Sequence, residues 1–187
     1  MGCERMTDAV LLLGDPRLRR TCDIVTDFSG LEFVEENRRL KNALDAFRKE
    51  KGFGRGIAAP QIGIPKRMIA LNLGDGTRTI VNPVITRRSD ATFTMWDDCM
   101  SFPDLLVMVR RHVSIDISYR DENGESREWT DMPQAESELM QHEMDHLDGV
   151  LALDRAITRE GIVYRKVFEA DREYFEDQVD YVIRPTI

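Results

Sequence analysis

The chain has 187 residues, 42% of them hydrophobic and 32% charged, and its formal net charge is −8. This composition is typical of a globular protein, and the net negative charge disfavours nucleic acid binding as a main function, because such binding needs a basic face; a local basic patch stays open. No apolar run approaches the roughly 20 residues that span a bilayer, so we expect no membrane partner. Three sparse cysteines without a C-x-x-C pair favour a reducing, cytoplasmic location without disulfides.

The first half of the chain predicts one helix and one hairpin. Residues 15–28 are polar and broken, which indicates an irregular surface segment. Residues 31–50 carry Leu40, Leu44 and Phe47 at helical spacing with charges between them, and two glycines follow, so an amphipathic helix is expected. Residues 67–73 and 78–81 flank a Gly-Asp-Gly turn, which predicts a β-hairpin.

The second half predicts strands followed by helices. Residues 112–120 alternate apolar and polar, and a turn at 121–124 leads into a further strand at 125–130. Helix formers fill the stretch between Pro133 and Gly149, and another helix is expected around 162–177. A helix, then strands, then helices indicates an α+β fold, and we expect one domain over 1–187 with 155–187 as a helical tail.

The helix after Pro133 contains an H-E-x-x-H pattern that begins at His142 and ends at His146. Residues four apart share a helical face, so two imidazoles can bind one zinc or iron ion. Glu143 follows the first histidine, at the position of a general base in metal hydrolases. A helix that carries two histidines by coincidence is the alternative, but the chain has only three histidines.

A catalytic metal site needs a third protein ligand and one open position. The residues alone leave four candidates open: Asp148, Asp154, His112 and Cys99. Two acids precede the cysteine, and their charge disfavours a thiolate unless a cation offsets it. A thiolate with two imidazoles suits zinc or ferrous iron.

The segment 52–63 reads G-F-G-R-G-I-A-A-P-Q-I-G. Closely spaced glycines let another backbone approach, which is consistent with a segment that faces the substrate. No Gly-Lys-Ser/Thr follows, so a phosphate loop is disfavoured. A flexible loop that enters a strand is the open alternative.

Three stretches, in this order, resemble the motifs of the peptide deformylase family. Residues 54–61 resemble G-x-G-x-A-A-x-Q, residues 97–101 resemble E-G-C-L-S, and residues 141–146 resemble Q-H-E-x-D-H. The resemblance extends over about residues 9–155. It implies mostly antiparallel sheets around a central H-E-x-x-H helix, with helices at both ends of the chain.

The resemblance also implies roles for individual residues. One divalent metal, commonly ferrous iron and otherwise zinc or nickel, would be bound by Cys99, His142 and His146. Glu143 would move the proton, while the Gln61 side chain and the Met100 backbone N–H would stabilise the oxyanion. The substrate would be an N-formylmethionyl nascent peptide, and products would be formate and a free N-terminus. Contact between the tail and the ribosome stays open.

The glycine-rich segment would pair with the extended peptide as an added strand, through Gly54, Arg55, Gly56 and Ile57. A further departure from the family lies one helical turn before His142, near the pocket for the first substrate side chain. Glu138 stands there, where the family often has an apolar residue or arginine. Glu138 is therefore a candidate substrate-binding residue, where an acid suits methionine less well than a neutral wall does. The alternative, which we favour slightly, is that its side chain turns to solvent.

The second motif departs from the family pattern through Asp97, Asp98 and Met100, which replace Glu, Gly and Leu. The family's acid pairs with a later arginine, so we expect Asp97 to pair with Arg110 or Arg111. Asp98 is the serious change, because it adds a carboxylate beside the metal ligand and the substrate path.

Asp98 and Glu138 leave alternatives to an active deformylase. One is a related hydrolase of a different N-acylated substrate. Another is a non-catalytic protein in which Asp98 closes the fourth metal position. An ordinary zinc endopeptidase is the weakest reading, because it leaves the glycine-rich and cysteine motifs unexplained.

Overall fold

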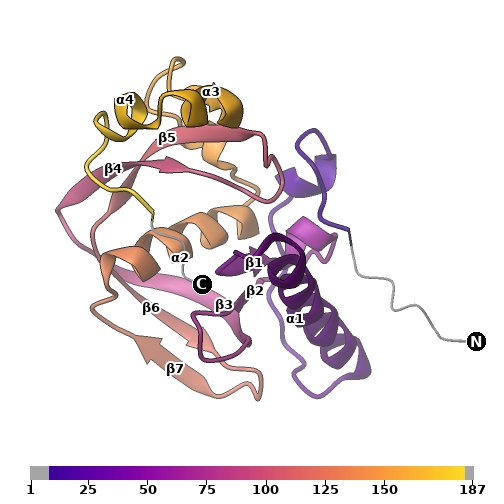
Figure 1. Cartoon of the computed structure of the whole chain (residues 1–187). Helices are drawn as coiled ribbons and strands as arrows, with labels where there is room; N and C mark the ends of the chain where they lie inside the picture. The colour runs from indigo at the N-terminus through magenta and orange to yellow at the C-terminus, as the bar shows by residue number, and fades with distance from the viewer. Residues whose placement is uncertain (1–8, 184–187) are drawn as a thin grey trace, which may run out of the picture.

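The computed structural model describes residues 9–183, and within them the strands form two sheets around helix α2 (Figure 1). The strands are β1 (Gly56–Ala58), β2 (Met68–Leu71), β3 (Arg78–Arg88), β4 (Thr92–Asp97), β5 (Leu105–His112), β6 (Ile115–Arg120), β7 (Ser126–Trp129) and β8 (Ile162–Tyr164). The helices are α1 (Leu31–Lys51), α2 (Gln134–Leu147), α3 (Arg165–Ala170) and α4 (Arg172–Glu176). One sheet has the order β1-β2-β3-β6-β7 and the other β4-β5-β8, with antiparallel pairing throughout these ladders. The predicted α+β fold is confirmed.

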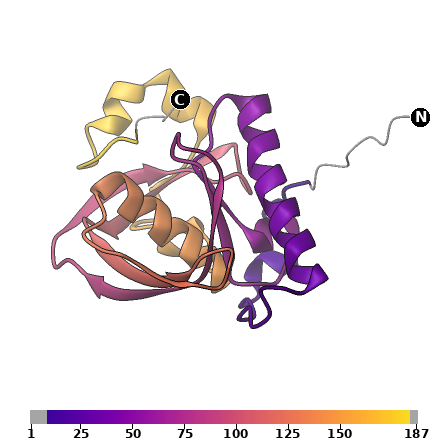
Figure 2. The ribbon, with the colours of Figure 1, turned by 90° about the horizontal axis from the view of Figure 1, so that it is seen from below.

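Helix α2 lies at the centre of the molecule, and the view from below in Figure 2 shows it, in orange, between the strands. Its apolar side packs on the larger sheet in one core cluster that includes Leu139, Met140, Met144, Leu147, Ile69, Leu71 and Ile117. Burial of these side chains fixes the rotation of the helix about its own axis. The remaining side, which carries the H-E-x-x-H residues, therefore faces the smaller sheet.

Helix α1 and the first hairpin follow the sequence prediction closely. Leu40 and Leu44 are buried in a second core cluster, and α1 ends where Gly52 takes a left-handed conformation with φ of 76°. Strands β2 and β3 pair with Leu71 opposite Arg78. Strand β3 extends beyond the predicted residue 81 because it also pairs with β6.

The strand predicted over 112–120 is in fact two strands in different sheets. Strand β5 ends at His112 and β6 begins at Ile115, and the chain changes sheets between them. A backbone hydrogen bond from Ser89 N–H to the Ser114 carbonyl oxygen (2.9 Å) holds this corner. Alternation continues through the corner, so the pattern alone does not reveal the break.

The single helix predicted around 162–177 is wrong. Ile162 to Tyr164 instead pair with the edge of β5, and α3 and α4 are separated at Asp171, whose φ and ψ are −145° and 61°. The tail packs through aromatic side chains: Phe168 and Phe175 lie edge-on to Trp96, with ring centroids 5.8 and 5.5 Å away.

Two further sequence predictions concern membranes and cysteines. Among the helices of residues 9–183, none is both long and apolar enough to cross a bilayer. Cys22 and Cys99 are buried free thiols, while Cys3 lies outside the described residues.

Candidate active site

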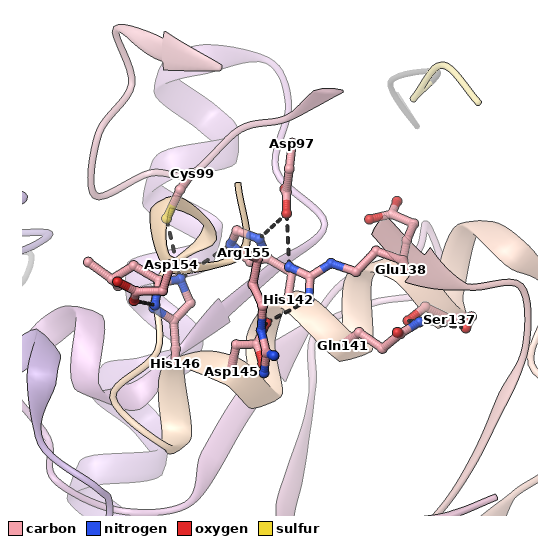
Figure 3. Close-up of polar contacts among 12 residues, drawn as sticks. Asp97, Cys99, Ser137, Glu138, Gln141, His142, Asp145, His146, Asp154 and Arg155 are labelled. Atoms are coloured by element: carbon pink, nitrogen blue, oxygen red, sulfur yellow. Dashed lines mark hydrogen bonds and ion pairs between the residues drawn. The ribbon is translucent and has the colours of Figure 1, made fainter. Parts of the chain in front are cut away.

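Three side chains converge between α2 and the turn that follows β4 (Figure 3). The Nε2 atoms of His142 and His146 are 3.2 Å apart, and the Cys99 sulfur is 3.3 Å from His146 Nε2. All three donor atoms lie within 4.8 Å of one another, and all three residues are buried. Two lone-pair nitrogens and a sulfur this close repel one another unless a proton or a cation lies between them. The donor set fits zinc or ferrous iron.

A buried polar atom beside the triad supports the same interpretation. Glu143 Oε2 is one of the buried side-chain atoms that have no hydrogen-bond partner within residues 9–183. A buried polar atom without a partner is costly, which is typical of a site built for a ligand or an ordered water. The chain therefore contains a metal-binding geometry with an acid directly beside it.

The other three candidates for the third ligand are excluded by their contacts. Asp148 pairs with Arg67 at 2.5 Å, and Asp154 pairs with Arg19. His112 lies at the end of β5, where its Nδ1 is 2.7 Å from a backbone carbonyl oxygen. Of the four, the structure brings only the cysteine to the two histidines.

A buried carboxylate orients the first histidine. Asp97 Oδ2 lies 3.0 Å from His142 Nδ1, so that nitrogen donates its proton and leaves Nε2 free to bind a metal. Arg111 Nη2 lies 3.0 Å from the same oxygen. Burial disfavours the charged form of Asp97, but His142 and Arg111 outweigh it and lower the pKa of this carboxyl.

Arg111, and not Arg110, is the arginine that pairs with Asp97. Asp97 stands opposite Val107 in the β4–β5 ladder, and side chains an even number of residues apart share one face of a strand. Arg111 shares the inner face with Val107, whereas Arg110 points outward and is exposed.

Glu143 is buried beside the triad, and burial raises the pKa of its carboxyl to about 7. A carboxyl with such a pKa can both accept and return a proton near neutrality. Gly56 makes room for it: a Cβ at residue 56 would lie 3.0 Å from Glu143 Oε1 and 3.1 Å from Leu71 Cδ2. The glycine of the first motif is thus explained by packing against the acid of the third.

Gln61 presents an amide N–H to the same place. Its Oε1 accepts a hydrogen bond from the Ala58 N–H (2.9 Å), which turns Nε2 toward Cys99 Sγ (3.5 Å) and Ser101 Oγ (3.3 Å). This amide is preorganised as a donor next to the metal-binding atoms.

A cavity of about 720 Å³ opens beside the triad. Its lining includes the predicted substrate residues Gly54, Arg55, Gly56, Asp98 and Glu138, and also Met100, whose backbone N–H is the predicted oxyanion donor. Ile57 differs, because its side chain is fully buried in the core and leaves only backbone at this edge of the sheet. Strand β1 is an edge strand, as strand addition by a peptide requires.

The prediction that Glu138 turns to solvent is wrong. Its side chain is only 2% exposed and forms an ion pair with Arg55. It lies one turn before His142 on the helix, and both residues line the cavity. Figure 3 shows the two side chains projecting from this helix. Arg55 compensates the buried charge, yet burial still raises the pKa of Glu138 to about 7.

Asp98 is not among the donor atoms that converge at the triad. Its carboxylate accepts a hydrogen bond from Arg165 Nη2 (2.9 Å), at the first residue of α3. No local sequence pattern marks Arg165 as a residue of the site. The tail contributes one part of the cavity wall, which includes Arg165, Phe168 and Arg172.

An α+β fold around an H-E-x-x-H helix, with a cysteine and two histidines converging beside a buried glutamate, defines a metal-dependent amide hydrolase. Comparison with known proteins identifies the family of hydrolases to which the chain belongs. Residues 7–161 match the family model described as polypeptide deformylase. The peptide deformylase of Thermotoga maritima is 32% identical over 159 residues, which cover 84% of this chain and 92% of that protein.

Two further relatives agree. The peptide deformylase of Pseudothermotoga lettingae is 30% identical over 183 residues, 96% of this chain and 100% of that protein. The crystal structure of a peptide deformylase from Synechococcus elongatus in complex with actinonin has a TM-score of 0.75 and 28% identity, covering 92% of this chain and 88% of that chain. The chain belongs to the peptide deformylase family of metal-dependent enzymes, and its activity is the deformylation of peptides.

Proposed function

We propose that Cys99, His142 and His146 hold one divalent metal at which N-formylmethionyl peptides are hydrolysed to formate and a free N-terminus. The convergence of the three donor atoms within 4.8 Å is the observation that carries this proposal. Ferrous iron is the proposed native metal, with zinc or nickel as substitutes, because one thiolate and two imidazoles accept all three.

A divalent metal at this site supplies the Lewis acidity that activates water and polarises the formyl carbonyl. Glu143 takes a proton from the attacking water and delivers it to the leaving amine, which its raised pKa supports. The Gln61 amide, held by the Ala58 N–H, donates to the oxyanion together with the Met100 backbone N–H. The peptide adds as a strand along the β1 edge, near residues 54–57.

The contact of Asp98 argues against a non-catalytic role. A structural metal site closes its fourth position with a protein ligand. Asp98, which immediately precedes Cys99, is the candidate for that ligand, but its carboxylate is bound by Arg165. The open cavity beside the triad supports a site that admits substrate.

We also propose one domain over residues 1–187 with 155–187 as its tail, a cytoplasmic location and nascent chains as substrate. Packing of Phe168 and Phe175 against Trp96 supports the first of these. The family relationship supports the other two. Contact between the tail and the ribosome belongs to the same proposal and would be measured by co-sedimentation with and without the tail.

The test is formate release from formyl-Met-Ala-Ser by anaerobically prepared ferrous protein. Glu143→Ala should abolish release while the metal content stays unchanged, because Glu143 is not a ligand. Glu128→Ala, on exposed β7, is the control and should retain full activity. Full metal occupancy without formate release from several formyl peptides would refute the proposal.

A further inference from the structure

The cavity beside the metal-binding atoms also contains a buried ion pair between Arg55 and Glu138. We infer that this pair selects N-formyl substrates whose first side chain is uncharged and forms hydrogen bonds, with glutamine as the best fit. N-formylmethionyl peptides are then substrates, but not the preferred ones. The inference rests on the proposed function and names the side chain that the same site favours.

Distance places the pair next to the first side chain of a substrate. Glu138 lies four residues before His142, which is about 6 Å along a helix. An extended residue spans about 3.5 Å, and the formyl group is attached to the first residue of the peptide. The first side chain therefore lies within one residue's length of the formyl carbon that is attacked. Arg55 immediately precedes β1, the edge strand proposed to bind the peptide backbone. The pair therefore lies between the β1 edge, proposed to bind the peptide backbone, and the metal-binding atoms.

The pair has hydrogen-bonding capacity that the protein leaves unused. Glu138 Oε1 accepts from Arg55 Nη2, and Arg55 Nη1 donates to the Ala135 carbonyl oxygen (2.8 Å). No donor within residues 9–183 bonds to Glu138 Oε2. A carboxylate accepts about four hydrogen bonds and a guanidinium donates five. A thioether that covered these atoms would leave them unpaired in a dry site, which weakens binding.

The charge of the pair decides which polar side chain fits. At a pH above the raised pKa of Glu138, its carboxylate and the Arg55 guanidinium together carry no net charge, so the pair offers no net attraction to a charged side chain. A carboxamide donates to Glu138 and accepts from Arg55 at the same time. Glutamine has the same unbranched length as methionine, so a cavity deep enough for one admits the other. Among the neighbouring charges, Asp98 is already bound to Arg165, and Asp97 to Arg111.

The experiment compares kcat/KM for formyl-Gln-Ala-Ser and formyl-Met-Ala-Ser. The ferrous wild-type enzyme should favour the glutaminyl peptide by about tenfold. The double variant Arg55→Ile/Glu138→Leu should reverse the preference, and removing both partners avoids leaving one buried charge unpaired. The matched control removes the ion pair of Lys41 with Glu122 (2.9 Å), which does not line the cavity, and should leave the ratio unchanged.

A second measurement needs no variant. The product tripeptide Gln-Ala-Ser should inhibit the wild-type enzyme more strongly than Met-Ala-Ser. A wild-type preference for formyl-Met, or a ratio that the double variant leaves unchanged, overturns the inference while deformylase activity stands. Loss of formate release from both peptides in the wild type would instead count against the proposed function.

Discussion

Replacing Arg111 with methionine should destabilise the protein strongly, because this buried side chain joins the buried carboxylate of Asp97 to the partly buried carboxylate of Asp145. Arg111 lies 3.0 Å from Asp97 and 2.6 Å from Asp145, and its side chain is only 4% exposed. Methionine fills much of the same space but carries no charge. The variant therefore removes the cation and leaves both acids in place.

The size of the effect follows from what each acid retains. Breaking a buried ion pair by removing one partner costs about 3–5 kcal/mol of unfolding free energy. Asp97 keeps His142 at 3.0 Å, and Asp145 keeps Arg155 at 2.8 Å, so we expect the lower end, about 3 kcal/mol. With a urea m-value of about 2 kcal/mol/M, the midpoint should fall by about 1.5 M.

Urea unfolding of metal-free protein, followed by circular dichroism, measures this shift without a contribution from metal binding. Arg110→Met is the matched control, because Arg110 is the adjacent residue on β5 and points outward. The control should change the free energy by no more than about 0.5 kcal/mol. Equal shifts for the two variants, or an Arg111 shift below about 0.5 M, would refute the electrostatic argument.

Three smaller perturbations test other contacts. Gly56→Ala places a methyl group 3.0 Å from Glu143 Oε1 and should lower kcat by about 10–100-fold with metal retained. Glu128→Ala, on exposed β7, is the control and should leave kcat unchanged. Burial raises the pKa of Cys22 to about 11, so its thiol should resist alkylation at neutral pH until urea unfolds the chain. Rapid labelling of Cys22 itself in the native protein, located by peptide mapping, would contradict this. Asp98→Gly breaks a half-exposed ion pair to α3 and should lower the free energy of unfolding in urea by at most about 1 kcal/mol. Amide hydrogen exchange in α3 should accelerate, because the pair holds α3 to the body of the protein. Unchanged exchange would show that the pair does not anchor the tail.

The sequence predicted the parts of the site that depend on local geometry. His142 and His146 lie on one helical face because four residues are slightly more than one turn of 3.6 residues, and that holds wherever the helix packs. The convergence of Cys99 on them depends on how the smaller sheet meets α2, so the spacing alone left four candidates. Family resemblance resolved that choice, and the structure agrees with it.

Glu138 shows why the remainder could not be predicted. A carboxylate is buried when a cation can meet it, and that cation is 83 residues away in sequence. Nothing near either residue in sequence marks the pair. The break between β5 and β6 could not be predicted for a similar reason. The alternation of apolar and polar residues indicates which side chains are buried, but it does not indicate which of the two sheets buries them.

The Cys99–His146 contact also has a consequence for the unfolded chain. Cys99 follows the smaller sheet, His146 belongs to the helix packed on the larger one, and the two are 47 residues apart. A metal held by both would act as a cross-link that closes a loop of this length, and a covalent link of that span restricts the unfolded ensemble by about 4 kcal/mol. The ion that carries the chemistry would thereby also fasten the two halves of the molecule together.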